Sequence, residues 1–272
     1  MTPPSVESIK SLRSPLAQTV EIHDTLSSTQ ERAKTLARDS ESPALHGTLV
    51  LAGIQTGGRG RLGRQWGSPD GGLWMSIVLR LELEASLAPR ITQAAAVGVA
   101  KALWEIGVEA RIKWPNDLLV DGKKICGILA ESSSGQKTPS PGGVSREPGP
   151  AILGIGLNAN LDPEDLKVPA REVTTIRAEL GHDIDLANVL SRILNNLHTE
   201  LGRLDDFAAI LQDWRALNCT LGERVRVQRS GESLEGRATD LTPEGALILE
   251  TTKGTVEIFE GEIERIRQSQ CS

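Results

Sequence analysis

Residues 58–66 read Gly-Arg-Gly-Arg-Leu-Gly-Arg-Gln-Trp, and this run constrains the fold more than any other part of the chain. Its glycines satisfy the G-x-G-x-x-G pattern of dinucleotide-binding loops, and an apolar, strand-like stretch precedes them at 48–54. A loop of that kind leads directly into a helix. Here residues 66–72 follow, reading Trp-Gly-Ser-Pro-Asp-Gly-Gly, which cannot begin a helix. The context therefore argues against a doubly wound dinucleotide-binding fold.

Residues 58–66, which we call the strap, have a composition that suggests a ligand. Glycine allows the backbone to approach a ligand closely, and arginine offers planar, permanently charged donors to phosphate and carboxylate. The alternative is a solvated, arginine-rich surface loop. The formal net charge of the chain is −6, which disfavours binding to nucleic acid or an anionic membrane. The strap is thus a local cationic exception, which favours a small anionic ligand.

The pattern of apolar residues predicts an α+β chain. Ser28 and Glu31 form the S-x-x-E pattern of a capping box, which predicts a helix running to about Arg38. An Asp121-Gly122 turn between two apolar runs predicts a β-hairpin. The remaining expected elements are strands near 48–54, 73–81 and 151–157, a long helix over 86–106, and helices near 185–202 and 205–217.

Two further changes of composition suggest the domain organisation. Residues 132–150 are rich in proline, glycine and serine, which predicts a long mobile hairpin loop because strand patterns resume on both sides. From Leu221 onward the pattern becomes short alternating strands at 224–228, 234–239, 246–250 and 255–259, typical of a small β-barrel. We therefore expect one domain over 1–219 and a second over 220–272.

The cysteines and the hydropathy pattern suggest a compartment. Cys126, Cys219 and Cys271 are odd in number and far apart, which excludes a disulfide framework and fits a reducing cytosol. The N-terminus lacks the pattern of a signal peptide, and no apolar run reaches the ~20 residues that span a bilayer. We expect a cytoplasmic protein without membrane attachment.

Polar residues around the predicted hairpin suggest chemistry. Asn116 and Asp117 lie at its mouth, where Asp117 suits magnesium or a nucleotide, unless the two are an ordinary turn pair. Strict alternation places Lys124 on the face of Cys126, where a lysine needs an anionic partner. Such a lysine would stabilise developing negative charge or orient a carboxylate for attack on phosphorus. The alternative is that Lys123 and Lys124 are ordinary hairpin lysines.

Other catalytic patterns are missing from the sequence. There is no G-x-S-x-G, no H-E-x-x-H and no P-loop lysine, and the four histidines form no pair at metal-ligand spacing. A nucleotide would therefore have to be held by the strap.

Four segments together resemble the biotin protein ligase family in order and spacing. They are the strap, residues 113–117 (Lys-Trp-Pro-Asn-Asp), residues 124–129 (Lys-Ile-Cys-Gly-Ile-Leu) and residues 154–158 (Gly-Ile-Gly-Leu-Asn). The resemblance covers roughly 22 to 267. It implies a mixed β-sheet catalytic domain of the class II synthetase-like biotin/lipoate ligase type, followed by an SH3-like β-barrel. Only about 20 residues precede the first matched segment, so it implies the form without a helix-turn-helix repressor domain.

The resemblance also implies a two-step reaction that uses ATP, biotin and Mg²⁺. The biotin carboxylate attacks the α-phosphate of ATP, giving biotinyl-5′-AMP and pyrophosphate. A lysine of a biotin carboxyl carrier domain, from acetyl-CoA carboxylase or a similar carboxylase, then attacks the mixed anhydride. Family members are monomers or homodimers, and this form implies no nucleic-acid partner.

Matching positions imply the site residues. Lys124 and Arg61 are the implied catalytic groups, Asp117 is the implied magnesium ligand, and either Arg265 or Arg267 would reach the nucleotide. The implied biotin contacts are Ser28, Thr29, Gln30, Gln55, Arg59, Gly60, Arg61, Lys124 and Gly127. The implied ATP and adenylate contacts are Arg59, Arg61, Arg64, Trp66, Asn116, Asp117, Lys124 and Asn158.

Two other functions remain as alternatives. A lipoate or octanoate transferase would share the general fold but predicts no full arginine strap. A nucleic-acid-binding regulator would use the strap and the C-terminal strands, but the acidic net charge and the missing helix-turn-helix disfavour it.

Overall fold

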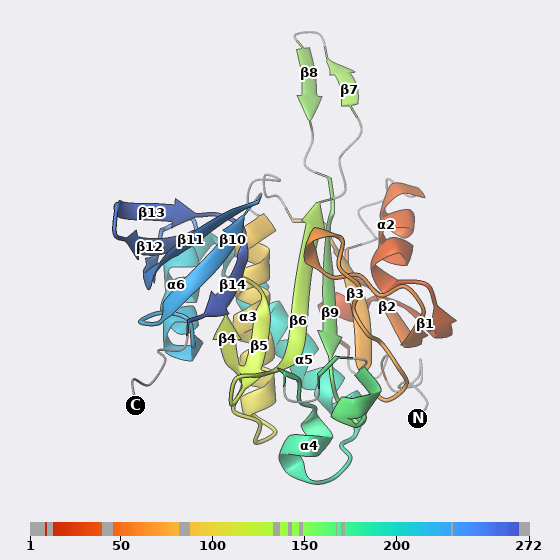
Figure 1. Cartoon of the computed structure of the whole chain (residues 1–272). Coiled ribbons are helices and arrows are strands. Elements are labelled where there is room, and N and C mark those ends of the chain that lie inside the picture. Colours follow the sequence, from red (N-terminus) through yellow and green to blue (C-terminus); the bar gives the residue numbers. More distant parts are fainter. Residues whose placement is uncertain are drawn as a thin grey trace.

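A computed structural model describes residues 9, 13–39, 46–81, 88–132, 137–140, 143–146, 149–166, 168–169, 172–229 and 231–266. A seven-stranded mixed sheet runs through the larger part of the molecule in the order β1-β2-β3-β9-β6-β5-β4 (Figure 1). The pair β1 and β2 is parallel, and all other neighbours are antiparallel. The strands are β1 (Thr19–Leu26), β2 (Thr48–Gln55), β3 (Leu73–Leu79), β4 (Arg111–Lys113), β5 (Asp117–Val120), β6 (Lys123–Ser132) and β9 (Ala151–Leu157).

Helices cover both faces of this sheet, and the period-2 alternation of the strands decides what meets them. On β3, Met75 and Ile77 join the large core with α3 (Ala88–Trp104), α5 (Leu186–Leu201) and α6 (Phe207–Leu217). Val78 faces the other way and packs with Ala33 and Ala37 of α2 (Thr29–Asp39). A short helix, α4 (Ile176–Leu180), follows the sheet. Short 3-10 turns lie at Pro15–Ala17, Arg61–Gly63, Pro163–Leu166 and Leu204–Asp206.

Most of the expected elements of this domain are present. Ser28 caps α2 by accepting from the Glu31 amide at 3.5 Å, as the capping-box pattern predicts. The strand β1 was not expected, because it is an edge strand whose residues are partly exposed and lack a clear alternation. Within the described ranges, no helix is both long enough and apolar enough to cross a membrane.

The C-terminal part is a five-stranded antiparallel sheet in the order β13-β12-β11-β10-β14. It docks on the larger domain through Gly245, whose carbonyl accepts from Gln93 Nε2 at 2.7 Å and from Trp114 Nε1 at 3.4 Å. The expected combination of a mixed-sheet domain and a C-terminal β domain is confirmed. The strands of the C-terminal domain are β10 (Arg224–Arg229), β11 (Glu232–Leu241), β12 (Leu247–Thr251), β13 (Gly254–Ile258) and β14 (Glu262–Arg265). The last of these, β14, was not expected.

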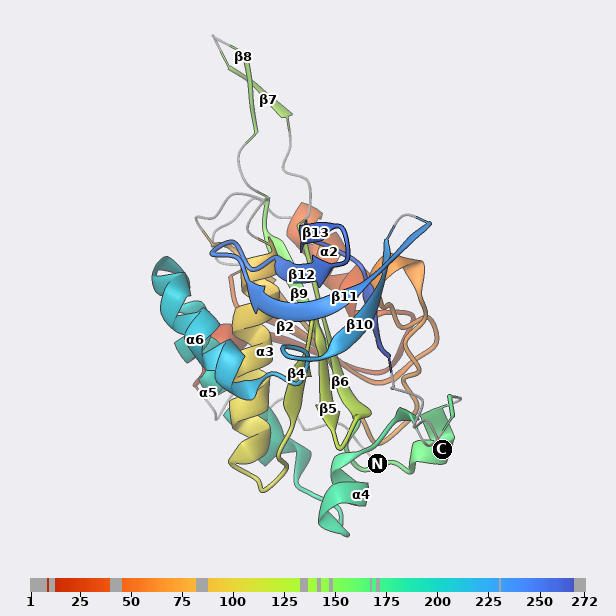
Figure 2. The same cartoon turned by 60° about the vertical axis from the view of Figure 1, so that its left-hand side comes forward.

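A narrow extension leaves the main sheet between β6 and β9. It contains the antiparallel pair β7 (Lys137–Ser140) and β8 (Gly143–Arg146), which projects away from the rest of the molecule in both views (Figures 1 and 2). Because β6 and β9 pair directly, this segment connects neighbouring strands and does not link two domains. The paired strands within 132–150 were not expected, and the mobility of the segment stays a prediction.

Candidate active site

A cavity of about 970 Å³ opens on the α2 side of the sheet and extends to the C-terminal domain. Its wall combines the start of α2, the strap, the hairpin of β5 and β6, and β9. Apart from the C-terminal arginine, all the residues proposed from the sequence as biotin or nucleotide contacts line it: Ser28, Thr29, Gln30, Gln55, Arg59, Gly60, Arg61, Arg64, Trp66, Asn116, Asp117, Lys124, Gly127 and Asn158. Segments as far apart in the sequence as Ser28 and Ile263 therefore share one cavity.

One end of the cavity, which we call the floor, is a buried network of neutral hydrogen bonds formed by Thr29, Gln30, Gln55 and Ser76. The amide oxygen of Gln55 accepts from the Thr29 backbone N–H at 2.8 Å and lies 3.1 Å from the Thr29 hydroxyl. The Ser76 hydroxyl lies 2.9 Å from that of Thr29 and donates to the Gln30 amide oxygen at 3.0 Å. The floor is thus held in place by the protein itself.

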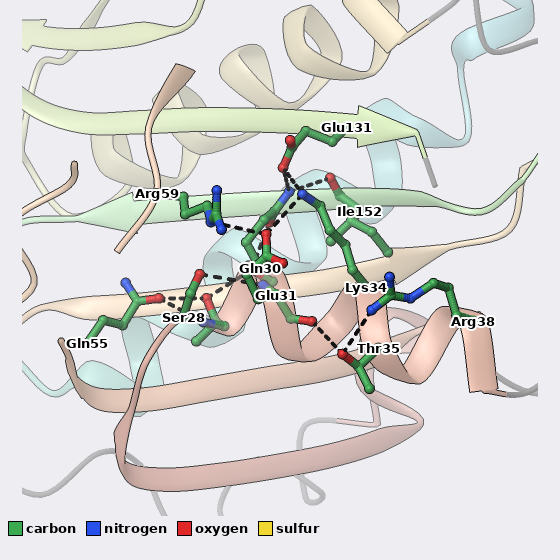
Figure 3. A network of polar contacts seen from close by, with 12 residues as sticks. Ser28, Gln30, Glu31, Lys34, Thr35, Arg38, Gln55, Arg59, Glu131 and Ile152 are labelled. Atoms are coloured by element: carbon green, nitrogen blue, oxygen red, sulfur yellow. Dashed lines mark hydrogen bonds and ion pairs between the residues drawn. The ribbon is translucent and has the colours of Figure 1, made fainter. Parts of the chain in front are cut away.

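The floor is connected by charged groups to the outer side of α2 (Figure 3). Gln30 Nε2 donates to a carboxylate oxygen of Glu131 at 2.9 Å and to the Ile152 carbonyl at 3.2 Å. The Lys34 ammonium bridges Glu131 and Glu31 at 3.0 Å and 3.1 Å. These contacts fix the orientation of the Gln30 amide, because both partners of its nitrogen can only accept.

Glycines in β6 and β9 make room for the Trp66 ring at the end of the strap. Gly127 and Gly156 lie opposite each other, and a Cβ added to either would come within 2.8 Å or 2.5 Å of the indole. Trp66 also packs edge-on against Trp74, with ring centroids 6.4 Å apart. The Trp66 Nε1 group is buried and has no hydrogen-bond partner in the described part of the chain.

Lys124 enters the cavity because of an irregularity in β6. The register against β5 shifts, so that Leu119 pairs with Lys124 but Leu118 pairs with Cys126. Lys124 therefore shares its face with Gly127, and the expectation that it shares one with Cys126 is wrong. Strict alternation fails because Ile125 is an extra residue in the strand.

The Lys124 ammonium lies 2.7 Å from Asp117 Oδ1 and 4.9 Å from the centroid of Trp66. The predicted need for an anionic partner is therefore met by Asp117. Cys126 points into the core instead, where burial raises the pKa of its thiol well above the usual range. The sequence thus identified the lysine correctly as a cavity residue but placed the wrong neighbour beside it.

The strap folds back on itself as a narrow turn, with hydrogen bonds from Gly60 N to the Arg64 carbonyl at 2.8 Å and from Trp66 N to the Gly58 carbonyl at 2.9 Å. Leu62 at its tip adopts a positive φ of 54°. A Cβ at Gly58 would lie 2.5 Å from the Trp66 carbonyl oxygen. The glycine at position 58 is therefore required by the close return of the chain.

The three strap arginines have different partners. Arg59 pairs with Glu31 at 3.1 Å, and Arg64 pairs with Glu262 of the C-terminal domain. Arg61 donates to the Asn116 side-chain oxygen and to the Gly261 carbonyl, both at 3.3 Å.

Burial lowers the pKa of Arg61, against the attraction of Asp117, Glu260 and Glu262. The guanidinium nevertheless stays charged, since arginine does not deprotonate in proteins. A partly desolvated cation whose hydrogen-bond acceptors in the described part of the chain are neutral is well suited to an incoming anion.

Asn158, proposed from the sequence as a nucleotide contact, has one side-chain atom without a hydrogen-bond partner among the described residues. The Asn158 amide nitrogen donates to the carbonyls of Thr174 and Lys124 at 3.0 Å and 3.3 Å. Its amide oxygen is buried and unpaired within the described residues. This oxygen, like the Trp66 N–H, marks a place where a ligand can complete the hydrogen bonding.

The C-terminal domain reaches the cavity through the segment that carries the two arginines considered from the sequence, but through other residues of it. Gly261 and Glu262 line the cavity, whereas Arg265 pairs with Glu223 at 2.6 Å and is not among the lining residues. Arg267, the other arginine considered, lies outside the described residues. Sequence reasoning also missed Ser76, Gly154 and Gly156, although two glycines at period 2 in a strand were a usable signal of close approach.

The carboxylates of the cavity allow only one kind of magnesium site. Among the described residues, no cluster of three or more histidine, cysteine, aspartate or glutamate side chains could hold a metal ion. Mg²⁺ commonly binds through one or two carboxylates together with substrate phosphates. Asp117 at the cavity wall fits that arrangement, with the phosphates as the other ligands.

Family models match two parts of the chain. The Biotin/lipoate A/B protein ligase family matches residues 23–140, and the Biotin protein ligase C terminal domain matches residues 220–265. The sequence is 36% identical over 249 residues to the bifunctional ligase/repressor BirA of Bacillus subtilis, covering 89% of this chain and 72% of that protein. It is 32% identical over 223 residues to biotin--[acetyl-CoA-carboxylase] ligase of Paracoccus denitrificans, covering 78% and 88%.

The fold is similar to solved structures of the same kind. Biotin protein ligase from Aquifex aeolicus in complex with biotin and ATP has a TM-score of 0.73 and 29% identity, with 92% of this chain and 99% of that chain covered. Both of these relatives, from Bacillus subtilis and Paracoccus denitrificans, exceed 30% identity over more than two thirds of their own lengths. The chain belongs to the biotin protein ligase family.

Proposed function

We propose that the cavity binds biotin and ATP and that the chain is an ATP-dependent biotin–protein ligase. Relatives of this chain carry the name biotin--[acetyl-CoA-carboxylase] ligase, and the similar Aquifex aeolicus structure contains biotin and ATP. The observation that carries the proposal is the meeting of a neutral, buried floor with the cations Lys124, Arg59, Arg61 and Arg64 in one cavity. A neutral ring system suits the first part, and phosphate and carboxylate suit the second.

We assign the biotin ring system to the floor, and the adenylate to the glycine-lined wall under Trp66. The hydrogen bonds of the floor are already made within the protein, so the ligand meets groups of fixed orientation. The unpaired Trp66 N–H and Asn158 oxygen are inferred nucleotide contacts. The biotin carboxylate then lies between the two parts, near Lys124.

The first step joins two anions. A biotin carboxylate oxygen forms a bond to the α-phosphorus of ATP while the bond from that phosphorus to the bridging oxygen breaks, and pyrophosphate leaves. Lys124 and Arg61 lower the repulsion between the reactants and stabilise the charge that develops on the phosphoryl oxygens. Lys124 would exchange its contact with Asp117 for the ligand.

In the second step a lysine amine of the carrier domain attacks the acyl carbon of biotinyl-5′-AMP. The new amide bond forms, AMP leaves with the electron pair of the acyl–oxygen bond, and the amine loses its extra proton to solvent or to AMP. The mixed anhydride hydrolyses readily, so a strap that covers it between the steps protects it from water.

We infer Mg²⁺ as a cofactor carried by the phosphates, with Asp117 as its protein ligand. When bound, it supplies positive charge that neutralises the phosphate oxygens. We also place the boundary between the catalytic and C-terminal domains at residues 219 and 220, next to the start of the C-terminal family match. The carrier is inferred to be a biotin carboxyl carrier domain, and a cytoplasmic location stays a prediction.

The test is transfer of labelled biotin to a purified biotin carboxyl carrier domain in the presence of ATP and Mg²⁺. We expect label on the carrier, loss of labelling without ATP, and competition by unlabelled biotin but not by lipoate or octanoate. A verified carrier that stays unlabelled contradicts the proposal. Transfer of lipoate or octanoate in place of biotin would assign the chain to the other transfer reaction of the same fold.

A further inference from the structure

Glu31 occupies the position that completes a capping box, but its side chain is used elsewhere. In a capping box the glutamate at the third helical position reaches back to the N-cap backbone N–H. Here the Glu31 carboxylate oxygen Oε1 lies 3.1 Å from Arg59 Nε and 3.1 Å from Lys34 Nζ. The first turn of α2 therefore holds the first arginine of the strap, 28 residues further along the chain (Figure 3).

The position of the Arg59 side chain depends on its ion pair with Glu31. Its side chain is 53% exposed, and Glu31 is its only ion-pair partner in the described part of the chain. Because Nε is the atom nearest to Glu31 in this ion pair, both Nη groups of the guanidinium remain for other acceptors. Arg59 lines the cavity, whereas Glu31 does not. Glu31 can thus act on a ligand only through Arg59.

Glu31 itself is held in place through a chain of contacts that begins at the floor. Lys34 holds Glu31 on one side and Glu131 on the other, and Glu131 accepts from the Gln30 amide, which is 97% buried. An isolated surface ion pair loses much of its value to the entropy of fixing two long side chains. In a chain of alternating charges the second carboxylate is already fixed, so less entropy is lost when Arg59 joins.

We propose that Glu31 is a positioning residue that holds Arg59, and with it the N-terminal end of the strap, over the cavity before any ligand binds. This inference rests on the proposed function only for its effect on turnover. Positioning by Glu31 lowers the cost of ordering the strap when biotin and the adenylate bind. It does not touch the reacting atoms, so it acts on ligand affinity and not on the chemical step.

The first test needs neither ligand nor activity. Trypsin cleaves after Arg59, Arg61 and Arg64, so limited digestion of the intact protein reports how often the strap opens. We expect Glu31→Gln to raise the rate of cleavage within the strap by about two- to fivefold, the range of an exposed ion pair. The control is Glu21→Gln, because Glu21 binds Arg32 of the same helix at 2.8 Å and has no contact with the strap.

The second test separates positioning from a general loss of structure. In Glu31→Gln the KM for biotin should rise by about two- to fivefold while kcat stays within about twofold, and Glu21→Gln should change neither parameter. Equal strap cleavage in Glu31→Gln and the unmodified protein overturns the proposal. So does equal cleavage in the two variants, since that result means that α2 as a whole has loosened.

If the unmodified protein transfers no biotin, the proposed function fails, and the digestion still decides the role of Glu31.

Discussion

The floor and the strap line the same cavity but are built in opposite ways. Thr29 and Gln30 of the floor are each 3% exposed and Ser76 is fully buried, and their hydrogen bonds are made within the protein. In the strap, Leu62 is 67% exposed and Arg64 pairs with a carboxylate at the surface. The floor is fixed by the fold, whereas the strap is held by contacts that water and ions weaken.

This difference suggests a division of labour. A fixed, neutral network discriminates between ligands by shape and by the set orientation of its polar groups, because these groups cannot turn to suit a different ligand without breaking hydrogen bonds within the protein. An exposed, cationic segment can open to admit a nucleotide and close over it. Changes in the floor should therefore cost stability and binding together, and changes in the strap should affect ligand retention with little effect on the fold.

The largest effect is expected where the two regions meet, at Lys124. Lys124→Ala removes the cation next to Asp117 without disturbing the core, since the lysine side chain is partly exposed. Loss of charge stabilisation at the reaction centre should lower the rate of adenylate formation by about 10²-fold while the melting temperature changes little. Pyrophosphate release in single-turnover experiments measures the rate, and a near-normal value would mean that another cation fills the role.

Ser76→Ala tests the floor. The change removes the donor to the Gln30 amide oxygen and leaves that buried oxygen unpaired. We expect a loss of about 1–3 kcal/mol in the free energy of unfolding, together with weaker biotin binding. Urea denaturation and calorimetric titration with biotin measure the two effects. A stable variant with unchanged affinity would show that the floor is less tightly determined than its hydrogen bonds indicate.

Gly156→Ala tests the wall under the strap. The new methyl group would lie 2.5 Å from Trp66 Nε1, so the ring must leave its position against the sheet over Gly127 and Gly156. A displacement of that size should raise the KM for ATP by about tenfold and affect biotin binding less. Steady-state kinetics with each substrate varied in turn checks this, and the quenching of tryptophan fluorescence by iodide should increase as the indole becomes exposed.

Glu262→Gln should have the smallest effect. Glu262 pairs with Arg64, whose side chain is 67% exposed, so the ion pair contributes little to stability. We expect an unchanged melting temperature and a change of no more than about threefold in the rate at which bound adenylate dissociates. Glu264→Gln, on the same strand and 74% exposed, is the matched control. A change much larger than threefold would mean that the strap depends on the C-terminal domain more strongly than its exposure suggests.

The sequence predicted the local features of the site better than the contacts between distant segments. Ser28 and the Asp121-Gly122 turn gave the start of α2 and the β5–β6 hairpin because capping and turn formation depend on neighbouring residues. The face of Lys124 could not be read from the sequence, because the extra residue Ile125 interrupts the alternation. The contact between Arg64 and Glu262 joins positions 198 residues apart, and no local pattern encodes it.

Hydrogen–deuterium exchange tests the contrast between floor and strap most directly. Exchange is compared in the free protein and with biotin, ATP and Mg²⁺ present. We predict slow exchange at the start of α2 and in β2 and β3, which carry the floor, in both states, and exchange in the strap that is faster in the free protein than when biotinyl-5′-AMP forms. A strap that is equally protected without ligand, or a floor that gains its protection only when ligand binds, would contradict the account.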